Sequence, residues 1–151
     1  MRRSRIFWCT LTLIALAVGL GPAPASAPSA DSPYKRLGGY DAIAAVVDDL
    51  IGRLMADPEL KRFFDPFSTD SRARIRQRLV EQLCVATGGS CVYTGRTMKA
   101  AHAGSGISEA NWTSFMNHAG ATLDKFKVPA KEKSEVVALL VTLKTDIVEK
   151  P

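Results

Sequence analysis

The chain has 151 residues and a formal net charge of +5, and its length fits one domain. Part of this charge is N-terminal, because Arg2, Arg3 and Arg5 are three of the 20 Lys and Arg residues. The rest of the chain has 17 basic and 15 acidic residues and therefore a net charge of +2. Nucleic-acid binding requires a clustered basic face, which this composition does not indicate, so we expect no nucleic acid among the partners.

Residues 1–30 have the order of a secretory signal peptide. Behind the N-terminal arginines an apolar run extends from Ile6 to Leu20, and small residues follow at 23–27. The run is short for a membrane anchor, which needs about 20 apolar residues, although a single anchor is the alternative. We predict a signal peptide over 1–30, cleaved between about residues 25 and 30, and a mature domain over 31–151. The expected location is exported, periplasmic or extracytoplasmic, with membrane contact only during export.

Apolar residues recur at helical spacing through the mature chain and predict an all-α fold without strand pairs. Glycine and proline separate the elements. In chain order these are a short turn at 33–37, a helix after Gly38-Gly39 that Asp57-Pro58 ends, a short segment at 59–64, a helix at about 70–86, a short helix at 97–103, a helix that Ser108 caps and that runs through Phe126, and a last helix from Pro129 through Ile147.

The helix at about 70–86 has an apolar stripe that includes Ile75, Leu79 and Leu83. Its four alternating arginines, at positions 72, 74, 76 and 78, are expected to form a mostly solvated face. Cys9 lies within the predicted signal peptide, so Cys84 and Cys91 remain, on either side of the turn that ends this helix. In an oxidising compartment they form a disulfide or remain as two buried thiols, and the sequence leaves both open.

His102 is the residue to which the sequence assigns chemistry. The chain has only two histidines, no Cys/His set at zinc spacing and no Cys-x-x-Cys-His segment for covalent haem attachment. His102 lies on a short helix between glycines and faces several apolar helices. It could supply the axial imidazole that haem iron needs, but a lone histidine is more often a surface or core residue. The expected apolar walls of such a site are Phe64, Met98, Ile107 and Phe115.

Several ordered motifs from Tyr34 to Val148 resemble the group I truncated haemoglobins. They are the opening turn YKRLGG at 34–39, the aromatic corner ADPELKRFF at 56–64, the loop TGG at 87–89 with YTG at 93–95, and the segment MKAAHAGSGI at 98–107. The resemblance implies a two-over-two helical sandwich that encloses haem b. It makes His102 the proximal iron ligand, Phe64 an aromatic clamp on the haem, Met98 a proximal contact and Tyr93 a cofactor-binding residue. Arg78 is then either a propionate partner or a solvated arginine.

The distal positions depart from those of many relatives, which have a Tyr on the first long helix and a Gln on the third. Here the matching residues are Ile51, Ile75 and Leu79, so the resemblance implies an apolar distal pocket. Gln82 or a water could still reach a bound gas, whereas Gln77 lies off the buried stripe. His118 is expected to be a structural histidine, with a second axial ligand as the alternative.

These residues predict reversible binding of the diatomic gases O2, NO and CO at a five-coordinate or water-bound iron. Oxygen binding and transport are among the expected roles, but tight oxygen storage is less favoured than the handling of NO, CO or redox equivalents. The alternatives are a nitric oxide dioxygenase or redox haem protein with an unidentified electron donor, a haem-free helical interaction module, and a protein in which Cys84 and Cys91 act as a redox switch. Whether the protein is an enzyme is left open, and it is expected to be a monomer or weak dimer.

Overall fold

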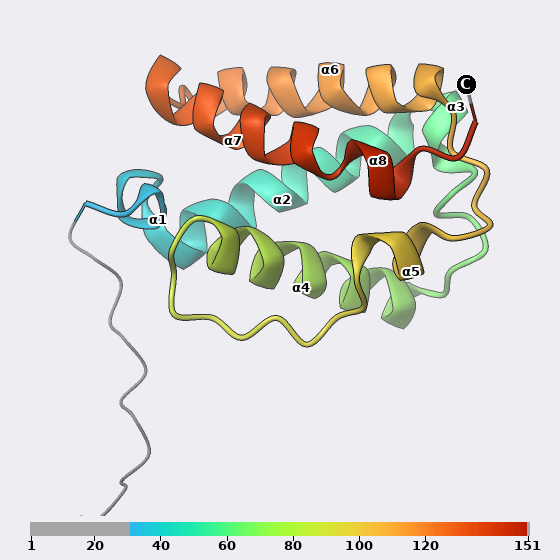
Figure 1. Ribbon diagram of the computed structural model, residues 1–151, viewed down its shortest axis with the longest axis horizontal. Coiled ribbons are helices and arrows are strands. Elements are labelled where there is room, and N and C mark those ends of the chain that lie inside the picture. Colours follow the sequence, from blue (N-terminus) through green and yellow to red (C-terminus); the bar gives the residue numbers. More distant parts are fainter. Residues whose placement is uncertain (1–30, 151) are drawn as a thin grey trace, which may run out of the picture.

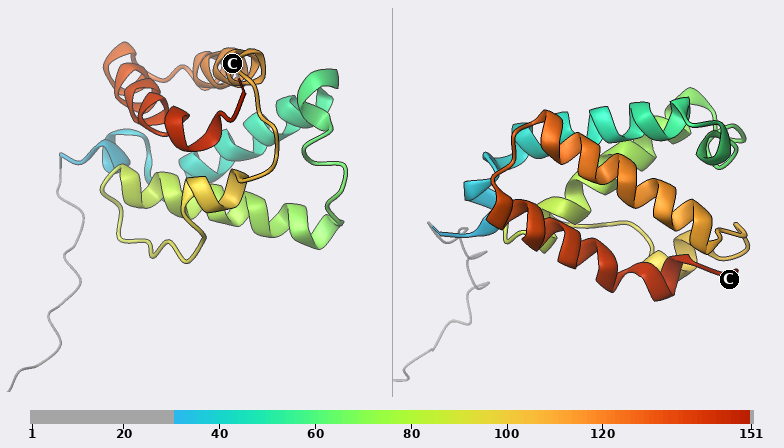
Figure 2. Two further views of the ribbon diagram at one scale, coloured as in Figure 1. Left: turned by 45° about the vertical axis from the view of Figure 1, so that its right-hand side comes forward. Right: turned by 90° about the horizontal axis from the view of Figure 1, so that it is seen from above.

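Two pairs of long helices dominate the described chain, which is residues 31–150 of a computed structural model (Figure 1). The helices are α1 (Pro33–Arg36), α2 (Gly39–Ala56), α3 (Pro58–Lys61), α4 (Thr69–Ala86), α5 (Met98–His102), α6 (Glu109–Lys125), α7 (Ala130–Thr142) and α8 (Lys144–Ile147). α2 packs on α4, α6 packs on α7, and α2 also packs on α6. Figure 2 shows the pair α6 and α7 lying over the pair α2 and α4. The predicted all-α, two-over-two architecture is confirmed.

Local sequence signals set the helix boundaries. The Ser108 side chain accepts the backbone N–H of Asn111 at 3.3 Å, and the Asn111 side chain accepts the Ser108 N–H at 3.1 Å, which forms a capping box. Asp57 ends α2 and its side chain caps α3. Gly38 has a φ of 93° between α1 and α2, a conformation that glycine adopts without strain. The N-cap residues with a side-chain bond are Ser32, Asp57, Ser68, Thr97 and Ser108.

Two clusters of buried side chains join α2 to its neighbours. The first consists of Ile43, Ala44, Val47 and Val80, and the second of Leu50, Leu54, Leu60 and Ala119. By contrast, the apolar faces of α4 and α7 are only partly covered by protein. Their half-buried members are Ile75, Leu79 and Leu83 on α4 and Val136, Val137, Leu139 and Leu140 on α7.

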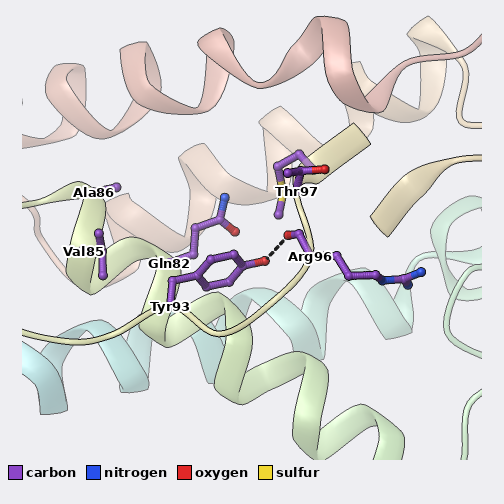
Figure 3. A pocket seen from close by; sticks show the side chains of 7 residues that line it. Gln82, Val85, Ala86, Tyr93, Arg96 and Thr97 are labelled. Carbon is purple, nitrogen blue, oxygen red and sulfur yellow. Dashed lines mark hydrogen bonds between the residues drawn. The ribbon is translucent and has the colours of Figure 1, made fainter. Parts of the chain in front are cut away.

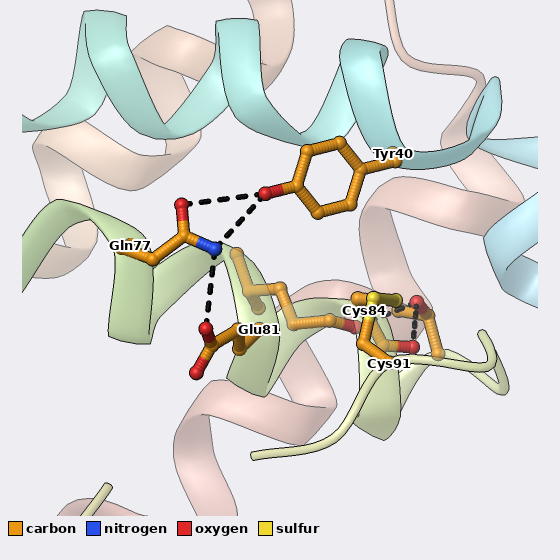
Figure 4. Close-up of a disulfide and its surroundings, with 7 residues drawn as sticks. Tyr40, Gln77, Glu81, Cys84 and Cys91 are labelled. Carbon is orange, nitrogen blue, oxygen red and sulfur yellow. Dashed lines mark hydrogen bonds between the residues drawn. A yellow bond between two sulfur atoms is a disulfide. The ribbon is translucent and has the colours of Figure 1, made fainter. Parts of the chain in front are cut away.

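A disulfide joins Cys84 at the end of α4 to Cys91 in the loop that follows (Figure 4). This outcome settles the choice between a bridge and two free thiols. Cys84 is fully buried, and a Cβ at Gly89 would lie 2.5 Å from the Cys84 Sγ atom. Glycine is therefore the residue that allows the chain to turn close beside the bridge.

The structure corrects two details of the predicted helices. The last predicted helix is broken at Leu143 into α7 and α8, where the Leu143 N–H bonds the Leu140 carbonyl in a tighter turn. Phe126, expected on an apolar helix face, caps α6 and is 39% exposed. Within residues 31–150, no helix has both the length and the apolar composition needed to cross a bilayer. The predicted signal peptide and Cys9 lie outside the described residues.

Candidate functional site

His102 is the last residue of α5 and is half-buried. Its Nδ1 atom lies 2.9 Å from the carbonyl oxygen of Met98, one turn earlier. A carbonyl only accepts hydrogen bonds, so Nδ1 is the nitrogen that donates, and in the neutral ring Nε2 is then the nitrogen with the free lone pair. The contact with the Met98 carbonyl therefore leaves Nε2 as the nitrogen through which this imidazole could bind a metal.

The loop after α5 is fastened to the C-terminal segment of the chain. The Gly104 and Gly106 N–H groups each donate to the Glu149 carboxylate at 2.6 Å. These two bonds lower the pKa of Glu149 below its ordinary value. Ser105 N–H and Oγ both donate to the His102 carbonyl, at 3.0 and 2.5 Å. Sequence reasoning missed Glu149, since only the two glycines, with φ values of 77° and 67°, hint at an unusual loop.

The three predicted distal residues lie on α2 and α4. Ile51 and Leu79 are half-buried and pack on the same cluster, around Val47 and Val80. Ile75 is also half-buried and lies one helical turn before Leu79, on the same face of α4. The structure thus brings together the two helices that carry these residues and gives them partly covered apolar side chains.

Phe64 and Phe115 are brought together on the second cluster, where both pack against the buried group that includes Leu60 and Ala119. Both aromatic side chains are half-buried. Ile107 is half-buried as well, and its carbonyl accepts the N–H of Glu149 at 2.8 Å. Of the four predicted apolar wall residues, Phe64 and Phe115 therefore lie on the second buried cluster, and Ile107 lies beside the loop that follows α5.

Met98, the fourth, lines a cavity of about 220 Å³ between the end of α4 and the start of α5. Tyr93 and Gln82 line the same cavity (Figure 3). The Tyr93 hydroxyl donates to the Arg96 carbonyl at 2.7 Å, which holds the loop in place. Gln77 instead donates to the Tyr40 hydroxyl at 3.0 Å (Figure 4), so it lies off the apolar stripe as predicted.

Arg78 is bound by groups of the protein itself. Its Nη1 atom donates to the Glu81 carboxylate at 2.7 Å and also to the Thr94 hydroxyl. The Arg78 bond is the main reason why the pKa of Glu81 is lowered. Arg78 thus ties α4 to the loop that leads to α5, and its predicted role toward a propionate stays a prediction.

His118 is a structural histidine in this fold. Its Nε2 atom lies 2.7 Å from Oδ2 of Asp57, which also accepts the Ser114 hydroxyl at 2.8 Å. The bond from His118, followed by those from Ser114 and the amide of Glu59, lowers the pKa of Asp57 to about 2. The prediction for His118 is confirmed, because its ligating nitrogen holds α6 to the start of α3.

The donor set suits a flat apolar cofactor held through one imidazole. Nε2 of His102 could serve as a single nitrogen ligand, and the other predicted site residues are half-buried and mainly apolar. Within residues 31–150, no group of three or more His, Cys, Asp or Glu side chains could hold a bare metal ion. One imidazole together with mainly apolar side chains is a donor set that fits haem.

Comparison with known proteins places the chain in a family. The profile described as bacterial-like globin matches residues 32–149. Over 116 residues the chain is 32% identical to a group 1 truncated hemoglobin of Mycolicibacterium paratuberculosis, covering 77% of this chain and 83% of that relative. It is 27% identical over 142 residues to one of Chlamydomonas moewusii, covering 93% and 81%.

Solved structures share the fold. The 2/2 hemoglobin of Synechococcus, with covalently attached heme, superposes with a TM-score of 0.71 at 27% identity and covers 78% of this chain and 98% of its own. The truncated hemoglobin of Tetrahymena pyriformis gives a TM-score of 0.72 at 24% identity, covering 80% and 100%. The chain therefore belongs to the bacterial-like globins, and among them it is a group I truncated globin.

Proposed function

We propose that the chain holds haem through His102 and binds the diatomic gases O2, NO and CO reversibly. Haem is the cofactor of the globins, to which this chain belongs. The observation that carries the proposal is the bond between His102 Nδ1 and the Met98 carbonyl, since it leaves Nε2 as the ligating nitrogen. Bound haem supplies an iron atom with a coordination position for the gas.

The contacts of His102 support its role as the proximal ligand. A carbonyl that accepts the Nδ1 proton fixes the tautomer and the ring plane, and it makes Nε2 a stronger electron donor. Thr97 caps the start of α5 through the Ala100 N–H at 3.2 Å, and Ser105 binds the His102 carbonyl at its end. The five-residue helix is thus held at both ends around the imidazole.

We further propose that Ile51, Ile75 and Leu79 line the gas-binding side of the cofactor. All three are half-buried, and none can donate a hydrogen bond to a polarised gas such as O2. A hydrogen bond of this kind contributes about 1.5–3 kcal/mol, so its absence speeds O2 release by about one to two orders of magnitude. This favours the handling of NO, CO or redox equivalents over tight oxygen storage.

The test of the ligand is the absorption spectrum of the purified chain with haem, in the ferric, ferrous and ferrous–CO forms. Wild type and His118→Gln should share a Soret band, whereas His102→Ala should lose it until imidazole is added. His118 is the matched control, because it is the only other histidine and a glutamine N–H can replace its bond to Asp57. An unchanged spectrum in His102→Ala would refute the ligand assignment. A wild type without a Soret band would refute haem binding.

Stopped-flow measurement of O2 release tests the apolar pocket separately. We expect release one to two orders of magnitude faster than from a truncated globin with a distal Tyr and Gln. A slow rate would contradict the assignment of Ile51, Ile75 and Leu79. If Gln82→Leu then restored fast release, Gln82 would be the missing donor.

The proposed setting is exported, periplasmic or extracytoplasmic, after removal of residues 1–30. The disulfide between Cys84 and Cys91 supports it, because such bonds persist in oxidising compartments. N-terminal sequencing of the protein from fractionated cells tests this part. A mature N-terminus between about residues 25 and 30 in the exported fraction is expected. Intact chain in the cytoplasm alone would contradict it.

A further inference from the structure

The chain after α8 runs along the loop that follows α5. The Glu149 and Lys150 N–H groups both donate to the Ile107 carbonyl, at 2.8 and 3.2 Å, and the Glu109 N–H donates to the Lys150 carbonyl at 3.1 Å. Ser108 and Lys150 form an isolated parallel bridge. This backbone pairing brings the Glu149 side chain to the loop at 104–106.

The Glu149 carboxylate fills a concave set of backbone donors. Its Oε1 atom accepts the Gly104 N–H and its Oε2 atom accepts the Gly106 N–H, each at 2.6 Å. Both glycines have positive φ values, which turn their N–H groups toward one anion. A Cβ at Gly106 would lie 3.0 Å from Lys150 Nζ, so the Lys150 side chain lies beside this glycine. Charge-assisted bonds of this kind are about twice as strong as neutral ones.

The same loop is joined directly to His102. Ser105, between the two glycines, donates through its N–H and Oγ to the His102 carbonyl at 3.0 and 2.5 Å. α5 buries none of its five residues, and it packs on α8, the helix that leads to Glu149. The C-terminal end of α5 is therefore tied to residues 104–106 through the His102 carbonyl.

We propose that Glu149 is a positioning residue for His102. Its carboxylate fixes the glycine loop, the loop fixes the end of α5 through Ser105, and the direction of His102 Nε2 follows. The inference rests on the proposed function, in which Nε2 is the iron ligand. It assigns no proton transfer to Glu149 and no contact between Glu149 and the cofactor.

The test compares Glu149→Gln with Asp146→Asn in the haem-loaded protein. Glu149→Gln keeps the side-chain shape but removes the charge and one acceptor oxygen. Asp146→Asn removes one charge from an exposed residue of α8 and is the matched control. The readouts are the iron–imidazole stretching band in the ferrous resonance Raman spectrum and the rate of haem transfer to an acceptor apoglobin.

We expect Glu149→Gln to shift or broaden the iron–imidazole band and to speed haem loss about tenfold, which corresponds to about 1.4 kcal/mol. Asp146→Asn should match the wild type in both measurements. A Glu149→Gln protein with the wild-type band and a rate within about twofold of the wild type would overturn the inference. A role confined to stability would lower the melting temperature and leave the band in place, which would overturn it too.

A second measurement separates this inference from the proposed function. Hydrogen exchange at the Gly104 and Gly106 amides, followed by NMR, should speed up in Glu149→Gln whether or not haem is bound. If the wild type bound no haem, the proposed function would fail, and unchanged exchange would show that Glu149 does not hold the loop. If Glu149→Gln did not fold, Glu149→Asp, which keeps the charge on a shorter side chain, would replace it with the same expected directions.

Discussion

Removal of the disulfide offers a quantitative test of how the fold holds the segment before α5. The change is Cys91→Ser, which breaks the bridge and leaves the fully buried Cys84 as a small apolar thiol. The two cysteines are seven positions apart, and the chain entropy of the loop they close corresponds to roughly 2.5 kcal/mol. Since unfolding a domain of about 120 residues has an entropy near 0.25 kcal/mol/K, we expect the melting temperature to fall by about 10 °C.

The assay is thermal unfolding followed by circular dichroism, at one protein and haem concentration. The wild type reduced with a dithiol should melt at the same temperature as Cys91→Ser, because both lose only the cross-link. Ser90→Ala, at an exposed position beside Cys91, is the control and should melt with the oxidised wild type. A Cys91→Ser melting temperature within about 2 °C of the oxidised protein would refute the reasoning.

Three further predictions concern the core, the acid range and the gas side. Val80→Ala should lower the free energy of unfolding, measured in urea, by about 2–3 kcal/mol, because Val80 is fully buried. Val92→Ala is the control: it changes a residue that is 73% exposed and should alter the free energy of unfolding by less than about 0.5 kcal/mol. The bond from His118 lowers the pKa of Asp57 to about 2, so this carboxylate stabilises the fold above about pH 4 and loses that effect as the pH falls toward 2. Asp57→Asn should therefore flatten the decline of the melting temperature in that range, and an equal slope would contradict this. Leu79→Gln places a hydrogen-bond donor on the proposed gas-binding side of the haem and should slow O2 release at least about tenfold in stopped-flow experiments. An unchanged rate would contradict the assignment of Leu79 to the gas-binding pocket.

The fold was predictable because its signals are local. Helical periodicity and capping residues such as Ser68 and Ser108 lie within a few positions of the boundaries that they set. The break at Leu143 was not predictable from the sequence, since neither glycine nor proline marks it, and it precedes α8, which packs on the distant α5. Phe126 fits the apolar period, yet the position at the end of α6 leaves it exposed.

The candidate site was predictable only in its local part. The Nδ1 bond of His102 reaches four residues back, which is an ordinary helical distance. Glu149 binds Gly104 and Gly106, which lie 45 and 43 positions before it, and no sequence pattern predicts such a pairing. The arginine face shows the same limit, because its sequence did not indicate that the partly exposed Arg76 binds the Asp48 carboxylate of α2 at 2.7 Å. The ion pair with Asp48 makes Arg76 a link between α4 and α2.

The small size of α5 has a consequence for how the protein matures. Isolated helices shorter than about 12–15 residues are marginal in water, and α5 has five residues and buries none. Glu149 is synthesised 45 residues after the glycine that it binds, so we expect α5 to become fully ordered only after α6, α7 and α8 have emerged. α2 and α4 can pair well before that stage. If Glu149 fixes the imidazole as proposed, we expect uptake of the cofactor to belong to the last stage of biogenesis, and a chain interrupted before Glu149 to have its main helices without a fixed imidazole.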